Sequence, residues 1–476
     1  GASGLAPHAR AAAWAPTSRV AMSSAPPAVR EPEASAQSVL GSDGVTVLPE
    51  DAPRPGAAED ALFAALDEDL PSYRESKTFG MEYTDTLQML VDTVRASVQD
   101  SRDPLYAARY WAYHLGRSGF FLLQQAALYG SLLATNSEAV SSGSKRGIRP
   151  EAMAKSAPRL LSESVRAFAQ DLRAIDRGDY KGPYDMEDLR HRQFNPAFIA
   201  SGLLRFVREG RATLERDARG QPDALWASLD SRLYPDYYKT FHYQTDGWMS
   251  SESARAYEVT TETLFLGRQD AMQRGTFVPL RRHLDRLRAA GRPTMGLDLL
   301  EVACGTGRFF TFTLDAFGES LSSATALELS PFYLERARAN VDYARGLRGW
   351  ASPRHVRFVQ GNAEAMPVAD GSADVVTCVY LFHELPLESR RAVAAEMARA
   401  LRPGGLLVVT DSLQRGDRPE WDPTLVNFEN LNEPHYRSYV TDSLTDLFVE
   451  AGLSPDWKGI RSASKTLSFT KPKAGE

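Results

Sequence analysis

The sequence feature that most constrains this chain is an apolar run that stops abruptly at a glycine turn, within residues 297–310. The apolar residues that suit a buried parallel strand are Leu297, Leu299, Leu300 and Val302. The turn Ala303-Cys304-Gly305-Thr306-Gly307 follows at once. Because glycine has no Cβ, such a turn lets the backbone approach a ligand closely, and a helix starting at Arg308 would direct unpaired N–H groups at the same place. The stretch predicts a binding turn for a nucleotide-like ligand.

The spacing of the glycines separates classes of nucleotide site. A dinucleotide-binding turn needs Gly-x-Gly-x-x-Gly, but counting from Gly305 puts Phe310 at the last position. This disfavours a nicotinamide-dependent enzyme. From Glu301 the residues read Glu-x-Ala-x-Gly-x-Gly, which resembles the first motif of class I S-adenosylmethionine-dependent methyltransferases with Ala303 in place of the first glycine.

Two later segments stand at the distances that this resemblance requires. The stretch ALELSPFYLERAR, residues 326–338, resembles the family's second motif and implies that Glu328 binds a ribose; a surface glutamate at a strand end is the alternative. After a third expected strand at 355–360, Asn362 stands where the family usually has an aspartate. Its side-chain oxygen can still accept from the adenine amino group, without the stronger charged bond.

The resemblance implies S-adenosylmethionine as the cofactor. Glu301 and the glycine turn would hold its methionine end, and Ala363 and Glu364 would flank its adenine. The full set of cofactor-binding residues that we expect is Glu301, Ala303, Cys304, Gly305, Gly307, Glu328, Leu329, Asn362, Ala363, Glu364 and Val379.

A fourth expected strand, 374–381, leads into Phe382-His383-Glu384 at its carboxyl end, where ligands bind in open α/β sheets. We expect His383 and Glu384 to be the catalytic residues, with His383 accepting a proton and Glu384 orienting or replacing it. The alternative is that His383 only packs beside the cofactor, since methyl transfer can proceed by proximity alone.

Strands and helices alternate from 297 to 411, where ALRPGGLLVVTD resembles the family's late motif, and two further strands are expected before 470. The resemblance, which is close to ubiquinone- and menaquinone-type small-molecule methyltransferases, implies an α/β fold with a doubly wound, seven-stranded Rossmann-like sheet. A chain of 476 residues exceeds the usual single core. We expect a disordered or transit segment at 1–58, a mostly helical N-terminal domain for acceptor binding or interaction at 59–292, and the class I methyltransferase domain at 293–476.

Within the N-terminal region the segment 109–135 is the most apolar. Polar residues, among them His114 and Arg117, leave too short an apolar stretch for a convincing bilayer span. We interpret the segment as a buried core helix, with a membrane-associated helix as the alternative.

Two segments are candidates for the acceptor side. The block 234–248 is dense in aromatic and polar residues, which suits either a wall around an aromatic or isoprenoid-like ligand or an ordinary interdomain core. The stretch 428–439 lies where the family often places an acceptor-pocket insertion, although a plain surface loop is equally consistent. The candidate substrate-binding residues are His242, Tyr243, Trp248, Glu433, His435 and Tyr436.

Composition limits the partners and the location. The first 55 or so residues are rich in Ala, Ser and Pro, and Arg10, Arg19 and Arg30 precede any acidic residue. This composition is typical of an organellar transit segment, and we expect a plastid rather than a mitochondrion. The alternative is a disordered tail without a targeting signal, on a cytoplasmic protein. A net charge of −6 does not indicate binding to nucleic acid. Peripheral contact with a membrane is possible, but no sequence feature supports it. Two cysteines imply no disulfide framework, and no metal-binding Cys/His cluster stands out.

The resulting hypothesis is methyl transfer from S-adenosylmethionine to a small organic acceptor, aromatic or lipid-like, by direct displacement. The alternative is a catalytically inactive scaffold that binds the cofactor, since Ala303 and Asn362 both depart from the family pattern. The acceptor atom and the oligomeric state stay open.

Overall fold

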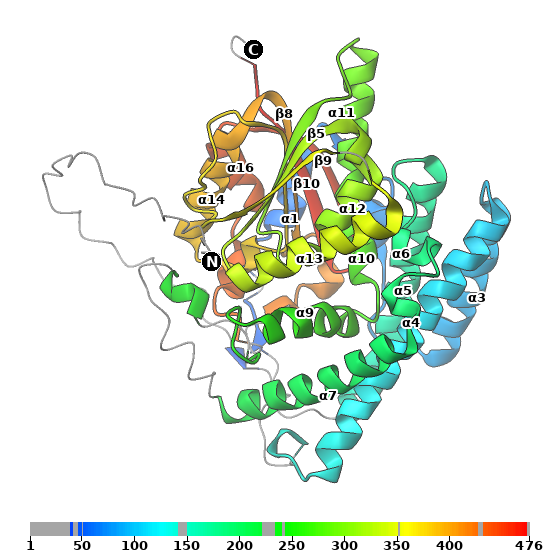
Figure 1. Cartoon of the computed structure of the whole chain (residues 1–476). Coiled ribbons are helices and arrows are strands. Elements are labelled where there is room, and N and C mark those ends of the chain that lie inside the picture. The colour runs from blue at the N-terminus through cyan, green and yellow to red at the C-terminus, as the bar shows by residue number, and fades with distance from the viewer. Residues whose placement is uncertain are drawn as a thin grey trace, which may run out of the picture.

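The computed structural model describes residues 39–40, 46–49, 51–140, 150–220, 234–239, 243–350, 353–426 and 432–473. The described part forms a layered α/β module with a group of long helices to one side of it (Figure 1). Residues 1–38, which carry most of the transit-segment prediction, lie outside the described residues.

The centre of the module is an eight-stranded sheet with the order β3-β9-β10-β8-β7-β4-β5-β6. Its strands are β3 (Ala65–Leu66), β4 (Leu297–Val302), β5 (Leu321–Glu328), β6 (His355–Gln360), β7 (Ala373–Val379), β8 (Leu401–Ser412), β9 (Ser454–Arg461) and β10 (Ser464–Thr470). Two-residue strands β1 (Val39–Leu40) and β2 (Thr46–Val47) pair separately. The doubly wound α/β class is confirmed. The seven expected strands are joined by an eighth, β3, because the N-terminal region adds two residues in parallel to β9.

The strand order places a topological switch point beside the glycine turn. The chain runs from β4 outward to β5 and β6, and then crosses to β7 on the other side of β4. The register sets Val302 beside Leu327 of β5 and Cys378 of β7, so three carboxyl ends meet there. Such a point is where an open α/β sheet binds its ligands.

Helices cover both faces of the sheet because alternate strand residues are buried on opposite sides. Leu407 and Val409 of β8 belong to one apolar cluster, whereas Leu406 and Val408 belong to the other. The helices of this module are α11 (Phe277–Ala289), α12 (Arg308–Phe317), α13 (Pro331–Arg348), α14 (Leu387–Ala400), α15 (Tyr436–Thr441) and α16 (Leu444–Glu450). Both cysteines, Cys304 and Cys378, are buried free thiols.

The long helices belong to the N-terminal region, as predicted. The α-helices of this region are α1 (Pro55–Ala58), α2 (Leu70–Glu75), α3 (Tyr83–Asp100), α4 (Pro104–Ala134), α5 (Pro150–Arg177), α6 (Tyr184–Glu187), α7 (Pro196–Arg219), α9 (Ser251–Leu264) and α10 (Gln269–Arg274). The sequence of residues 250–274 predicts one long helix. This prediction is wrong: the chain breaks between α9 and α10, since Leu266 and Gly267 adopt positive φ of 50° and 79°. Within the described ranges, no helix is long and apolar enough to cross a membrane.

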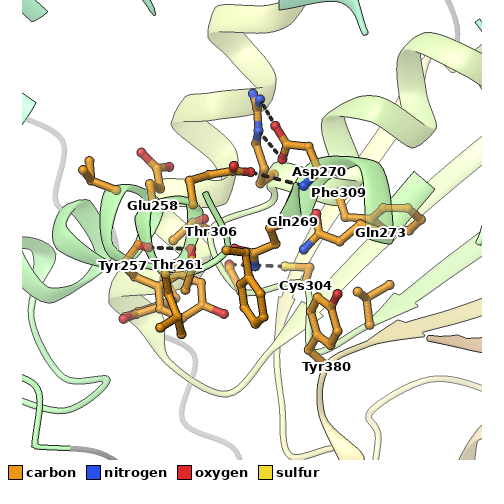
Figure 2. A pocket seen from close by; sticks show the side chains of 18 of the residues that line it. Tyr257, Glu258, Thr261, Gln269, Asp270, Gln273, Cys304, Thr306, Phe309 and Tyr380 are labelled. Carbon is orange, nitrogen blue, oxygen red and sulfur yellow. Dashed lines mark hydrogen bonds and ion pairs between the residues drawn. The ribbon is translucent and has the colours of Figure 1, made fainter. Parts of the chain in front are cut away.

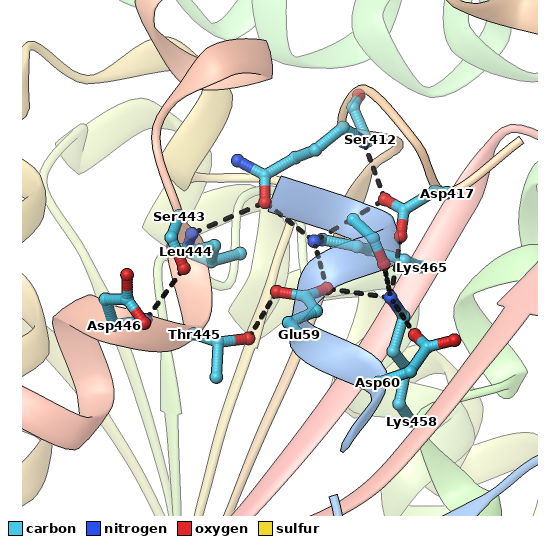
Figure 3. Close-up of polar contacts among 12 residues, drawn as sticks. Glu59, Asp60, Ser412, Asp417, Ser443, Leu444, Thr445, Asp446, Lys458 and Lys465 are labelled. Atoms are coloured by element: carbon cyan, nitrogen blue, oxygen red, sulfur yellow. Dashed lines mark hydrogen bonds and ion pairs between the residues drawn. The ribbon is translucent and has the colours of Figure 1, made fainter. Parts of the chain in front are cut away.

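A buried ionic cluster ties the start of the described chain to the last two strands (Figure 3). Glu59, at the start of η1 (Glu59–Leu62), accepts from Lys465 and Lys458 at 2.8 and 2.9 Å. Lys458 also contacts Asp417 at 2.8 Å, and these four side chains are almost fully buried. We call them the latch. The predicted domain boundaries at 58/59 and 292/293 stay predictions, but in space Glu59 is part of the sheet module.

Candidate active site

One cavity of about 740 Å³ opens at the carboxyl ends of β4, β5 and β7 and is covered by α9 and α10. Of the expected cofactor-binding residues, nine line it: Glu301, Ala303, Cys304, Gly305, Glu328, Leu329, Asn362, Ala363 and Val379. The structure therefore brings together segments that the chain separates by as many as 78 positions, from Glu301 to Val379. Gly307 and Glu364 are not among the lining residues.

The turn after β4 has the backbone geometry of a ligand cradle. Ala303 and Gly305 both adopt φ of 55°, and a Cβ at Gly305 would meet nothing within 4 Å. Gly307 serves a different purpose, because a Cβ there would lie 2.9 Å from the Cβ of Ala337. Gly307 is thus required for packing α12 against α13, and it does not line the cavity.

Glu301 supplies a buried acid at the floor of the cavity. Its side chain is 2% exposed, and no group among the described residues hydrogen-bonds to its Oε2. Burial raises the pKa of Glu301 well above its usual value. An unpartnered buried carboxyl oxygen is costly, and it fits a ligand that brings an N–H donor such as an ammonium group.

Glu328 ends β5 at the rim of the turn. Its Oε2 accepts from the Gly305 N–H at 3.0 Å, and its Oε1 accepts from the Ser330 N–H at 2.9 Å. Burial raises the pKa of Glu328 despite these hydrogen bonds. A third backbone N–H, that of Leu329, also hydrogen-bonds to this carboxylate. Since each carboxylate oxygen can accept two hydrogen bonds, Glu328 keeps acceptor capacity for a ribose hydroxyl.

Asn362 and Glu364 form a small turn on the adenine side. The Asn362 Oδ1 accepts from the Glu364 N–H at 2.9 Å, which leaves one acceptor site on that oxygen. The Glu364 carboxylate accepts from the hydroxyl of Tyr237 and so holds the segment before α9 to this turn.

His383 lies in η6 (Phe382–Glu384), directly after β7. Its Nδ1 is 2.6 Å from Oδ1 of Asp411, and its Nε2 is 3.4 Å from Oε1 of Glu384. Burial disfavours the imidazolium, but the carboxylates of Asp411 and Glu384 outweigh it and raise the pKa of His383 well above its usual value. His383 and Glu384 both line the cavity.

Asp411 is a site residue that sequence reasoning missed. It is fully buried at the end of β8, where its Oδ2 accepts from the N–H groups of Leu381 and Phe382 at 3.1 and 2.7 Å. We expected β7 to reach residue 381, but it ends at Val379. The contacts of Asp411 with Leu381 and Phe382 hold the loop that follows and so position His383. The available signal was an acid closing the fifth expected strand beside the loop with the histidine.

The candidate acceptor residues separate into three groups. Trp248, Glu433 and Tyr436 line the cavity. His435 and Tyr243 do not: the backbone carbonyl of His435 accepts from Arg390, and that of Tyr243 accepts from Arg216. His242 lies outside the described residues.

Other lining residues stand at positions that we did not name as candidate site residues from the sequence. Figure 2 shows Gln269 and Gln273 of α10 facing the turn that carries Cys304. Their Oε1 atoms are buried, and no described group hydrogen-bonds to them. Tyr380, at the end of β7, also lines the cavity and has φ of 58°, which is strained for a residue other than glycine.

Comparisons with known proteins agree with this arrangement. The family described as a methyltransferase domain matches residues 299–405. A demethylmenaquinone methyltransferase from Beutenbergia cavernae is 30% identical over 208 residues, which cover 44% of this chain and 70% of that protein. The chain covers less of two other relatives. It is 33% identical to a demethylmenaquinone methyltransferase from Lactococcus lactis over 34% of this chain and 57% of that protein. It is 32% identical to a fatty-acid O-methyltransferase from Mycolicibacterium smegmatis over 36% of this chain and 61% of that protein.

The chain thus spans about six tenths of the length of the last two relatives and more than two thirds of the first. The matched residues include the glycine turn, Glu328 at the end of β5, and Asn362 and His383 in the loops after β6 and β7. The chain belongs to the class I S-adenosylmethionine-dependent methyltransferases.

Proposed function

We propose that the protein binds S-adenosylmethionine and transfers its methyl group to a small organic acceptor, aromatic or lipid-like, by direct displacement. The observation that carries the proposal is the cavity in which the glycine turn, Glu328 and the His383–Asp411 pair meet. The acceptor classes follow from the aromatic lining and from the names of the quinone and fatty-acid relatives.

The lining residues fit the cofactor. The orphaned Oε2 of Glu301 and the open cradle at Gly305 suit the methionine end, and the vacant acceptor sites of Glu328 suit the ribose. Asn362 and Ala363 would hold the adenine. When bound, S-adenosylmethionine supplies a methyl group that is already activated on a sulfonium. The protein has to align the acceptor, exclude water and manage one proton.

His383 manages that proton in the proposed reaction. With Nδ1–H donated to Asp411, the neutral ring presents the lone pair of Nε2 to the cavity. Glu384, beside Nε2, stabilises the imidazolium that forms when the acceptor gives up its proton. Exclusion of water comes from α9 and α10, whose side chains cover the turn.

Isothermal titration with S-adenosylmethionine and S-adenosylhomocysteine tests the proposal. We expect both to bind, and we expect Glu328→Ala to weaken binding at least about tenfold, because two charge-assisted hydrogen bonds are lost. Glu335→Ala, on the exposed side of α13, is the control and should bind like the native protein.

Absence of binding to either nucleoside would overturn the proposal. An unchanged affinity in Glu328→Ala would disprove the ribose assignment. Binding without turnover in a labelled-methyl screen of metabolite extract would favour the inactive scaffold instead.

A further inference from the structure

The cavity continues past the methyl-transfer site into the helical region. Its outer part lies between the middle of α4, the first turns of α7 and the end of α9. Its apolar walls include Phe120 and Phe121 of α4, Ile199 of α7 and Val259 of α9. We call this outer part the chamber.

The chamber opens to solvent through an apolar mouth. Phe194, Phe198 and Ile199 line the cavity and are nevertheless 37, 38 and 36% exposed, and Leu264 is 53% exposed. Large apolar side chains that line a cavity and also reach solvent mark its entrance. An exposed apolar group of this kind indicates a binding site for an apolar ligand.

Gly116 makes room in the chamber wall. It lies within the 31-residue helix α4, where glycine is a poor helix former, and a Cβ there would meet nothing within 4 Å. Gly119, one turn away, has equally open surroundings but is not a lining residue. The two glycines therefore provide a matched pair for experiments.

The charged residues at the inner end of the chamber neutralise one another. Arg308 contacts Asp270 and Asp185 at 2.6 and 2.5 Å, and Arg117 contacts Asp270 at 3.4 Å. Burial and the nearby Asp270 raise the pKa of Glu262 to about 8, so this acid is largely protonated at neutral pH. Arg308 and Arg117 then face Asp270 and Asp185, so this group of four side chains carries no net charge.

We infer that the chamber binds the flexible apolar chain of an amphipathic acceptor, whose methyl-accepting head lies at His383 while the chain extends to the mouth at Phe198 and Leu264. This inference rests on the proposed function. A volume of about 740 Å³ lies in the upper part of the range of ligand pockets, ~300–1,000 Å³, as a site for a nucleoside and an acceptor together requires.

Calorimetric titrations with acids and phenols of different chain length test the inference. Dodecanoate is compared with butanoate, and 4-octylphenol with phenol, with and without saturating S-adenosylhomocysteine. Each buried methylene adds roughly a factor of four in affinity. If the chamber buries only about three or four of the eight extra methylenes, a long-chain ligand binds on the order of 100-fold more tightly than its short partner, and we expect at least this gain for at least one of the two pairs.

Variants then locate the chain. Gly116→Phe fills the chamber and should weaken the binding of the long-chain ligand at least about tenfold. Gly119→Phe should leave the affinity for this ligand within about twofold of the native value. The affinity for S-adenosylhomocysteine should be unchanged in both variants. Phe198→Asp at the mouth should also weaken it, whereas Leu204→Asp should not. Leu204 is on the same helix, is 71% exposed and does not line the cavity. The mouth pair keeps the test valid if Gly116→Phe does not fold.

Equal affinities for long and short chains, no binding of either long chain, or equal losses in the matched variants would each overturn the inference. The two proposals fail separately. If the long-chain ligand binds but neither nucleoside does, the cofactor site is refuted and the inference about the chamber stands. If the nucleosides bind but affinity does not depend on the chain length of the ligand, only the inference about the chamber is refuted.

Discussion

Ala303 holds a left-handed backbone conformation at the position where the family usually has glycine, with φ of 55°. Such a conformation costs about 1–2 kcal/mol for a residue with a Cβ, and glycine loses about 0.5–1 kcal/mol of that advantage through its unfolded-state entropy. The alanine at position 303 thus strains the backbone of the turn, but the turn keeps the left-handed conformation.

We predict that Ala303→Gly raises the free energy of unfolding by about 0.5–1 kcal/mol, measured by urea denaturation. Ala339→Gly, on an exposed helical position of α13, is the control and should lower it by about 1 kcal/mol. A loss of stability in Ala303→Gly would show that the alanine is not strained.

His383 carries a second prediction, on the pH dependence of the proposed reaction. The carboxylates of Asp411 and Glu384 overcome burial and raise its pKa, so the ring keeps its proton to higher pH than an exposed histidine and has to lose this proton before it can act as a base. Activity should therefore increase as the pH rises through this raised pKa. In Asp411→Asn the increase should move to lower pH, because the negative charge that helps to raise the pKa of His383 is removed.

The measurement is the methyl-transfer rate against pH at saturating cofactor, with S-adenosylhomocysteine affinity as the control for folding. His383→Gln should lower the rate on the order of 10²–10⁴-fold. A full rate and an unchanged profile in that variant would instead support the alternative in which His383 only packs beside the cofactor.

At the scale of elements, the latch decides where the first described segments lie. Glu59 and Lys465 are separated by about 400 positions and both are buried, so their contact fixes η1 against β10. Removing one member of a buried pair leaves the other charge uncompensated.

We predict that Lys465→Met lowers the free energy of unfolding by about 3–5 kcal/mol. Arg281→Met, which breaks the exposed i,i+4 pair with Asp285, should lower it by less than about 1 kcal/mol. Denaturation curves for the two variants provide the comparison, and equal small losses would mean that the latch adds little.

The sequence predicted most elements of the module because their signals are local. The helix expected to start at Arg308 is α12, and the strand expected at 355–360 is β6. It missed β3 because two residues carry no periodicity, and their pairing with β9 depends on residues far along the chain. The break after α9 was also missed, since Leu266 is not a residue that usually adopts positive φ.

At the scale of the whole molecule, buried histidines make the fold sensitive to acid. Burial lowers the pKa of His114 to about 3, and that of His191 and of His283 to about 4. In the unfolded chain these rings titrate near 6.5. Protons then bind the unfolded state first as the pH falls, so stability is full above about 6.5 and is lost progressively toward the lowered values.

We predict that His114→Phe, which keeps the ring contact with Phe168, makes the loss of stability between about pH 6.5 and 4.5 less steep. The free energy of unfolding as a function of pH checks this, with His355→Gln, on the exposed side of β6, as the control. Parallel curves for His114→Phe and the native protein would rule out this histidine as a cause.

The sequence by itself determined the succession of the main strands along the chain, the glycine turn and the acids that end the strands. These features depend on local periodicity and on short spacings between residues, which can be seen in the sequence directly. Only the tertiary structure decided that Asp411 positions His383, that Gln269 and Gln273 face the turn, and that the helices enclose a chamber with an apolar mouth. Each of these features joins residues from separate elements. Their contacts arise when whole faces pack together, and no short segment carries that information.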